Sequence, residues 1–142
     1  VLPNDTNVLG NILGGRVMHY MDICAAMSAY KHARSPVVTA SVDRLNFLAP
    51  AKMGDILILK SSVNYTGNTS MEVGVRIESE NTISGEINHT ASAYLTFVSL
   101  DHQRKPKQVA EINPETANEV RRFKEAEMRK EIRQSRLNKI VE

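Results

Sequence analysis

The chain has 142 residues, of which 42% are hydrophobic and 24% charged, and its formal net charge is +2. These values suit one soluble domain, and they leave no basic field that would bind nucleic acid through its phosphates. No apolar run approaches the roughly 20 residues of a membrane helix, we expect no signal peptide, and the single Cys24 excludes an intrachain disulfide, so we expect a cytoplasmic protein without membrane or nucleic-acid partners.

The first predicted element is a helix over residues 16–33, directly after Gly14-Gly15. It contains neither glycine nor proline, and its apolar and small residues recur at spacings of three and four, as on one face of a helix. The helix ends before Pro36, because a proline disfavours helical backbone in the residue before it. The many small side chains indicate that the helix lies close to a sheet.

Four predicted strands follow, at residues 37–47, 55–65, 69–80 and 88–100. The third alternates clearly between apolar and charged positions, which is the period of a strand with one buried face. The sequence Thr66-Gly67-Asn68 predicts a hairpin turn between the second and third strands. One helix followed by a mostly antiparallel meander predicts an α+β fold in which a curved sheet packs on the helix.

The last segment, residues 113–142, predicts a long charged helix, and residues 1–112 form the preceding domain. Asn113 is expected to be the N-cap residue, with Pro114 in the first helical position. A sparse apolar stripe among alternating charges is typical of a solvated helix that packs along the surface or on a neighbouring subunit.

Chemistry concentrates in residues 4–22. Gly14 and Gly15 open the helix, so unpaired backbone N–H groups and the positive end of the helix dipole point outward there. Such groups suit the oxygen of a thioester carbonyl that becomes negative during attack. Glycine at a helix start is also common for purely conformational reasons.

Asp22 lies too deep in the predicted helix to cap it. It is either an exposed or salt-bridged residue, or a catalytic carboxylate that holds a water or itself attacks a carbonyl. His19, three residues earlier, is more simply a surface or interface residue, and Cys24 a small core residue. The four histidines and the cysteine show neither metal-ligand spacing nor a Ser-His-Asp or Cys-His set, so we expect no metal.

The spacing of these residues resembles the hotdog-fold acyl-CoA thioesterases (acyl-CoA hydrolases), the family of brain acyl-CoA hydrolase and small bacterial acyl-CoA thioesterases. The resemblance covers about residues 2–100. The first segment carries the specific matches, which are Asp5-Thr6-Asn7, Gly10-Asn11, Gly14-Gly15 and Met21-Asp22. Later matches support the fold, namely Phe47-Leu48-Ala49-Pro50, Gly54-Asp55, Tyr65-Thr66-Gly67, Ser70-Met71-Glu72-Val73 and Ser79-Glu80-Asn81.

The resemblance implies a fatty acyl-CoA hydrolase without a cofactor, in which a long helix is wrapped by a curved antiparallel sheet. Two such subunits pair their sheets edge to edge, and three dimers form a homohexamer. Asp22 is then the catalytic carboxylate, and the partner subunit's Asn7 positions the water or the thioester. The backbone of Gly14 and Gly15 holds the carbonyl.

Two departures from the family pattern stand out. Leu13 replaces the His or Phe that many relatives carry before the glycine pair, which changes the contacts around the carbonyl site. The vertebrate relatives contain two hotdog domains in tandem, whereas this sequence shows one, so both halves of each site must come from identical chains.

The sequence offers only candidate residues for contacts with CoA and with the acyl chain. Phosphates need nearby Lys or Arg, and the tightest basic run outside the tail lies between residues 104 and 107, with a solvated basic loop as the default interpretation. Three methionines are candidates to line an acyl tunnel, with core packing as the default interpretation. The CoA candidates are Asn11, Thr66, Gly67, Ser70, Arg104 and Lys105, with Lys107 in the same run and Lys60 and Arg76 as alternatives; the methionines are Met18, Met21 and Met27.

Two other functions fit a hotdog fold. A non-catalytic acyl-CoA sensor would be expected to carry a DNA-binding helix-turn-helix, which the sequence does not show. A hydratase or dehydratase would need a histidine a few residues after its aspartate, and Asp22 has none at that distance.

Overall fold

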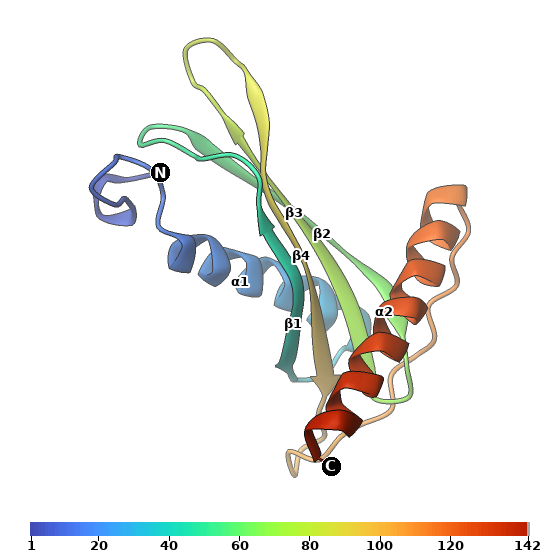
Figure 1. Cartoon of the computed structure of the whole chain (residues 1–142). Coiled ribbons are helices and arrows are strands. Elements are labelled where there is room, and N and C mark those ends of the chain that lie inside the picture. Colours follow the sequence, from blue (N-terminus) through green and yellow to red (C-terminus); the bar gives the residue numbers. More distant parts are fainter. Residues whose placement is uncertain (142) are drawn as a thin grey trace.

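The computed structural model describes residues 1–141, with side chains as far as residue 140. One long helix lies on one face of a four-stranded antiparallel sheet, and a second helix crosses the other face (Figure 1). This arrangement confirms the predicted hotdog architecture. In chain order the elements are η1 (Pro3–Asp5), α1 (Gly14–Ala33), β1 (Val37–Phe47), β2 (Ile56–Thr66), β3 (Ser70–Glu80), β4 (Ile87–Ser99) and α2 (Ala117–Val141).

The strands lie in the order β1-β4-β3-β2. The meander therefore holds for β2, β3 and β4, whereas β1 lies beside β4 at the opposite edge from β2. The link between β1 and β2 crosses one end of the sheet and is held there by backbone hydrogen bonds. Leu48 donates to Thr90, Ile12 donates to Ala51, and Met53 donates to Gly10. The first bond joins the link to β4, and the other two join it to the N-terminal loop.

The core lies between α1 and the sheet. The alternation predicted for β3 is confirmed, because its apolar positions are buried and face α1. On α1 the buried positions recur every four residues, and two of them are alanines with no exposed surface, which lets the helix approach the strands closely. The buried residues of these two elements are Val17, Met21, Ala25 and Ala29 on α1 and Met71, Val73, Val75 and Ile77 on β3.

The second helix is fixed to the outer face of the sheet by a buried ion pair. Arg129 donates to both carboxylate oxygens of Glu72 on β3, at 3.0 and 2.6 Å. Its guanidinium carbon also lies 3.6 Å from the ring centroid of Tyr94. Burial lowers the pKa of Arg129, but the hydrogen bonds and charge of Glu72 outweigh it and raise this pKa above its ordinary value.

The predicted start of this helix at Asn113-Pro114 is wrong, because α2 begins at Ala117. Thr116 caps it by accepting a hydrogen bond from the N–H of Glu119, whose carboxylate accepts from the N–H groups of Glu115 and Thr116. These backbone hydrogen bonds lower the pKa of Glu119. This reciprocal capping box outcompetes an Asn-Pro start.

Neither helix in the described part of the chain carries an apolar stretch long enough to cross a bilayer.

Candidate active site

Two irregularities in β1 decide which of its side chains face α1. Neighbouring odd and even positions of a regular strand point to opposite faces. The pairing with β4 shifts once between Thr39 and Ser41 and again between Asp43 and Asn46, where Arg44 has a φ of 50°. Each shift inserts an extra residue, so three side chains spaced three apart, those of Thr39, Val42 and Leu45, line the same cleft.

This cleft lies between α1 and β1 and has a volume of about 340 Å³. Asp22 reaches across it from α1, and its Oδ1 accepts a hydrogen bond of 2.6 Å from the hydroxyl of Thr39. Thr39 thereby fixes one carboxylate oxygen of Asp22, and the second remains available to a water or a substrate. Both side chains are exposed in the single protomer, at the sheet edge formed by β1.

The walls of the cleft are largely apolar. Met21 is buried at its base, whereas Met18 is 47% exposed. The default interpretation of the methionines as core residues therefore holds for Met21 and is wrong for Met18. Met27 is 65% exposed and lies away from this cleft, near the end of α1. His19 is an exposed residue, as expected, yet it also lines the cleft beside Asp22.

The glycine pair opens the first turn of α1, so the helix starts two residues before its predicted start at residue 16. Within the described chain, no side chain caps this terminus, and the first backbone N–H groups with a partner are those of Arg16 and Val17, which donate to Leu13. Gly15 lines the cleft, and an added Cβ there would meet open space. A Cβ on Gly14 would lie 3.5 Å from the Phe47 ring, so Gly14 packs against a side chain while Gly15 faces the cleft.

Asn7 organises the loop before α1. Its Oδ1 accepts from the N–H groups of Leu9 and Asn11, at 3.0 and 3.2 Å. These loop bonds use only Oδ1, so they leave out the two N–H donors of the amide nitrogen. The side chain of Asn7 is exposed. One protomer does not bring Asn7 into the cleft of Asp22.

A partly buried ion pair connects this loop to the helix start. The carboxylate of Asp5 is buried, lies 3.4 Å from Nε of Arg16 and accepts from the N–H of Leu2. The backbone oxygen of Asp5 also accepts from the N–H of Leu13. The Asn7 loop and the glycine pair are therefore held in a fixed relation to each other.

The remaining CoA candidates lie outside the cleft of the same protomer. The turn from Thr66 to Ser70 packs beside α2, where an added Cβ on Gly67 would lie 2.9 Å from Nζ of Lys130, and the Thr66 hydroxyl accepts from the N–H of Ile112. Arg104 and Lys105 belong to an exposed turn closed by Asp101. Asn11 is half-buried in the Asn7 loop.

Sequence reasoning missed Thr39. Its position in a Val- and Thr-rich strand looks like ordinary β-propensity, and regular alternation would place it opposite Val42. The bulge that reverses this placement leaves no residue pattern that could have revealed it. The contact to Asp22 was therefore invisible in the sequence.

Residues 9–86 match the family described as the thioesterase superfamily. The uncharacterized acyl-CoA thioester hydrolase YkhA of Bacillus subtilis is 42% identical over 120 residues, which cover 84% of this chain and 70% of that protein. A crystal structure described as an apo-hexameric acyl-CoA thioesterase superposes with a TM-score of 0.93 at 48% identity, over 96% of this chain and 88% of the other.

An acyl-CoA hydrolase from Staphylococcus aureus, solved in complex with butyryl coenzyme A and coenzyme A, superposes with a TM-score of 0.91 at 41% identity, over 99% of this chain and 86% of the other. It was also solved with single alanine substitutions of an aspartate, an asparagine and a threonine. In that protein the asparagine precedes the aspartate by 15 residues and the threonine follows it by 17. Asn7, Asp22 and Thr39 have the same spacing.

The family match spans more than half of the chain, a relative covered to 70% of its length is 42% identical, and the architecture is shared. This chain therefore belongs to the thioesterase superfamily and has its hotdog fold.

Proposed function

We propose that this protein is an acyl-CoA thioesterase that hydrolyses fatty acyl-CoA to a free fatty acid and CoA, with Asp22 as the catalytic carboxylate. The observation that carries this proposal is the hydrogen bond from Thr39 to Asp22 inside an apolar cleft that Gly15 also lines. The equal spacing of the three residues substituted in the acyl-CoA hydrolase from Staphylococcus aureus supports the assignment.

The cleft supplies the carboxylate, the backbone donor and the apolar walls that a hydrolysis needs. The acyl chain lies along Met18, Val42 and Leu45, and the thioester oxygen faces the N–H of Gly15. A water attacks the carbonyl carbon and gives its proton to the free oxygen of Asp22. The negative charge on the carbonyl oxygen is stabilised by the N–H group and by the helix dipole. When the C–S bond breaks, the proton on Asp22 returns to the sulfur of CoA.

The second half of the site comes from another protomer in this proposal. β1 is a sheet edge, and both Asp22 and Thr39 lie beside it. Two copies that pair through β1 bring the partner subunit's Asn7 loop to this edge, where its amide donates to the water or the thioester. The loop carries two exposed apolar side chains, Val8 and Leu9, which such pairing would cover. We propose a trimer of these dimers, as in the hexameric relative.

Hydrolysis of palmitoyl-CoA, followed by release of free thiol, tests the activity directly. Saturable turnover without any added cofactor is the expected result. Binding of palmitoyl-CoA without turnover would favour an acyl-CoA sensor instead. In this proposal the protein works in the cytoplasm, and CoA phosphates contact the basic residues Arg104 and Lys105 of a neighbouring protomer.

Replacement Thr39→Val should lower kcat about 10- to 100-fold, because it removes one hydrogen bond to a charged catalytic group of about 1.5–3 kcal/mol. Valine keeps the branched shape of threonine, so the strand should remain intact. Replacement Thr39→Ser, which keeps the hydroxyl, should restore most of the activity. Equal activity of the valine and serine variants would show that the hydroxyl does not orient Asp22.

Mixing two inactive variants tests whether the site is shared. Asn7→Asp keeps the oxygen that holds the loop but removes the donor, and Asp22→Asn removes the carboxylate. In a heterodimer one site then receives both native residues and the other receives both substitutions. Random 1:1 exchange makes about half of the dimers heterodimers, so about one quarter of wild-type activity should return. Subunit exchange is verified with differently tagged chains. Verified exchange without recovered activity would contradict a site built from two protomers.

A further inference from the structure

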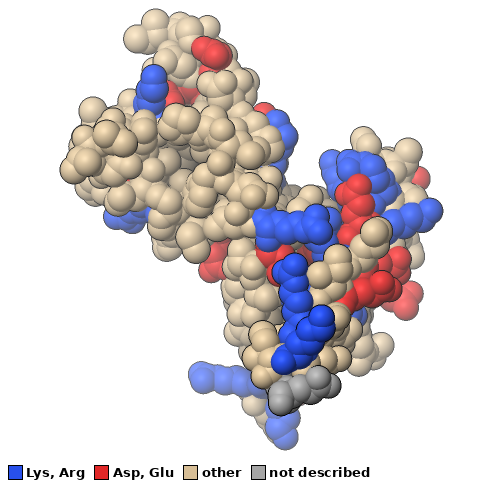
Figure 2. Space-filling model, in the orientation of Figure 1, with Lys and Arg blue, Asp and Glu red and all other residues tan. Residues whose placement is uncertain are grey.

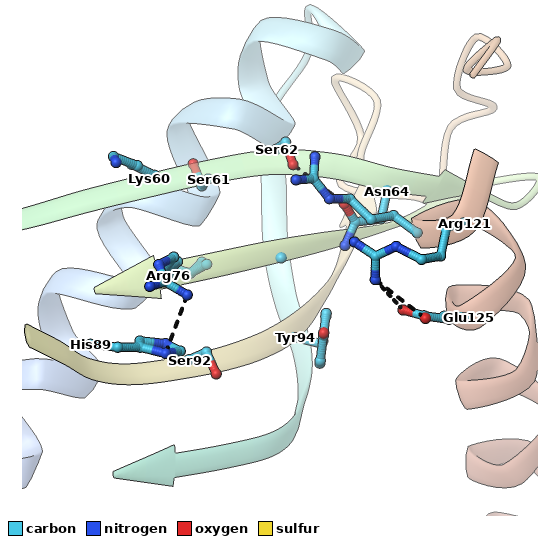
Figure 3. A pocket seen from close by; sticks show the side chains of 13 residues that line it. Lys60, Ser61, Ser62, Asn64, Arg76, His89, Ser92, Tyr94, Arg121 and Glu125 are labelled. Carbon is cyan, nitrogen blue, oxygen red and sulfur yellow. Dashed lines mark hydrogen bonds and ion pairs between the residues drawn. The ribbon is translucent and has the colours of Figure 1, made fainter. Parts of the chain in front are cut away.

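A second polar pocket of about 480 Å³ lies between the outer face of the sheet and the first turns of α2 (Figure 3). Its strand residues include Lys60 on β2, Arg76 on β3 and Tyr94 on β4, while Arg121 and Arg122 line it from α2. The sheet separates it from the cleft at Asp22, because that cleft lies on the α1 side. Within one protomer, the two sites therefore open on opposite faces.

The pocket contains more positive than negative charge. Lys60 and Arg76 share the single carboxylate of Glu78, at 2.8 and 3.6 Å. Arg121 pairs with Glu125 along α2 at 3.3 Å. Arg122 forms no ion pair within the described residues. The charge of Arg122 acts on nearby Glu119, so four cations are accompanied by three carboxylates, and Figure 2 shows Lys and Arg side chains gathered over α2 and its junction with the sheet.

The floor of the pocket is a built feature. Asn64 is only 6% exposed, and its amide nitrogen would lie 2.6 Å from a Cβ added to Gly74 on the neighbouring strand. Glycine at position 74 therefore makes room for this amide. The Asn64 oxygen accepts from the hydroxyl of Ser62, whereas its amide nitrogen donates to no acceptor among the described residues. This amide nitrogen keeps access to solvent, so it can donate to a water or to a ligand in the pocket.

His89 also lines the pocket, but its unpaired donor is buried beneath the pocket surface. Arg76 approaches its Nδ1 at 3.2 Å, and because a guanidinium only donates, Nδ1 must accept. The ring proton of neutral His89 is therefore on Nε2, which is buried and has no partner among the described residues. The accessible donors of the lining are the guanidinium groups of Arg76, Arg121 and Arg122 and the ammonium group of Lys60.

We infer that this pocket is a binding site for a small phosphate-bearing anion, separate from the thioesterase cleft. A phosphate brings negative charge and several acceptor oxygens, which suit guanidinium donors. A carboxylate, with two oxygens, would satisfy fewer of the donors that converge from β2, β3, β4 and α2. The bound anion would bridge α2 to the sheet and so stabilise the docking of this helix.

Inorganic pyrophosphate is the probe, titrated calorimetrically into the full chain in a buffer free of phosphate. We expect saturable binding of one pyrophosphate per protomer and a higher melting temperature of the complex. Arg122→Gln should weaken binding at least about tenfold, which corresponds to the loss of one charge-assisted hydrogen bond. Gly74→Ala, which fills the floor, should weaken it as well.

Lys124→Gln is the matched control, because it removes the same charge from an exposed position of α2 outside the pocket. It should change the pyrophosphate affinity by less than about twofold, as expected of a screened surface charge. Arg122→Gln and Lys124→Gln should both hydrolyse acyl-CoA like the wild type when pyrophosphate is absent. Equal losses in Arg122→Gln and Lys124→Gln, or no saturable binding at millimolar pyrophosphate, would overturn the inference.

Free CoA distinguishes the two sources of a phosphate ligand. If saturating CoA leaves pyrophosphate binding unchanged, the pocket is independent of the substrate. Displacement of pyrophosphate by CoA would instead assign the pocket to the substrate's own phosphates, and the separate site would be disproved.

Discussion

Replacement Asp22→Asn should lower kcat for palmitoyl-CoA by about 10²- to 10⁴-fold, the usual contribution of a general base. Asparagine keeps an oxygen that can accept from the Thr39 hydroxyl, so the geometry of the cleft should survive. It cannot accept the proton of the attacking water. KM should change much less than kcat, because the apolar walls that hold the acyl chain are unaltered. Initial rates of thiol release across a range of substrate concentrations separate the two parameters.

Asp43→Asn provides the matched control for this experiment. Asp43 lies on the same edge strand but pairs with Arg133 of α2 at 2.8 Å, on the opposite face of the sheet. Its replacement removes an equal charge without touching the cleft and should leave kcat within about twofold. Light scattering should show that the Asp22→Asn and Asp43→Asn variants assemble like the wild type. Full activity of Asp22→Asn would refute the mechanism and leave only the architecture.

Replacement Arg129→Leu should lower the free energy of unfolding by about 3–5 kcal/mol, because it leaves Glu72 buried without its partner. The exposed fractions of the two side chains are 7% and 4%, so water cannot substitute for the lost guanidinium. Contact with the Tyr94 ring is lost as well. Urea denaturation at a fixed protomer concentration measures the effect.

Arg121→Leu is the comparison at an exposed position of the same helix. Its pair with Glu125 is solvent-exposed and should contribute only about 0.3–0.5 kcal/mol. The double replacement Glu72→Met with Arg129→Leu should recover much of the lost stability, since no unpaired buried charge remains. An equal effect of Arg129→Leu and Arg121→Leu would show that the buried pair does not hold α2 on the sheet.

Much of the fold could be predicted because it depends on local periodicity. The alternation through Met71, Val73, Val75 and Ile77 places these residues on one face whatever their neighbours are, and they are the buried face of β3. The four strands were predicted to within one residue of their observed ends. The start of α2 was missed because two capping signals compete there, and the pair of Thr116 and Glu119 prevails.

The candidate site could be predicted only in part. The spacing of Asn7, the glycine pair and Asp22 pointed to the thioester chemistry, and both Asp22 and Gly15 line the cleft. The separate roles of the two glycines depend on Phe47, which lies more than 30 residues away in the sequence and covers only Gly14. The sequence also offered candidate CoA contacts from its basic run and its turn residues, but the choice among them depends on how protomers pack together.

By itself, the sequence determined the helix that carries Asp22, the strands and the family, because periodicity and residue spacing are local properties of the chain. Only the tertiary structure decided that Thr39 meets Asp22, since two bulges in β1 reverse the direction of its side chains. It likewise paired Arg129 with Glu72, and it gathered the basic pocket from three strands and a helix. Such contacts depend on strand register and helix docking over long sequence distances, which no local pattern encodes.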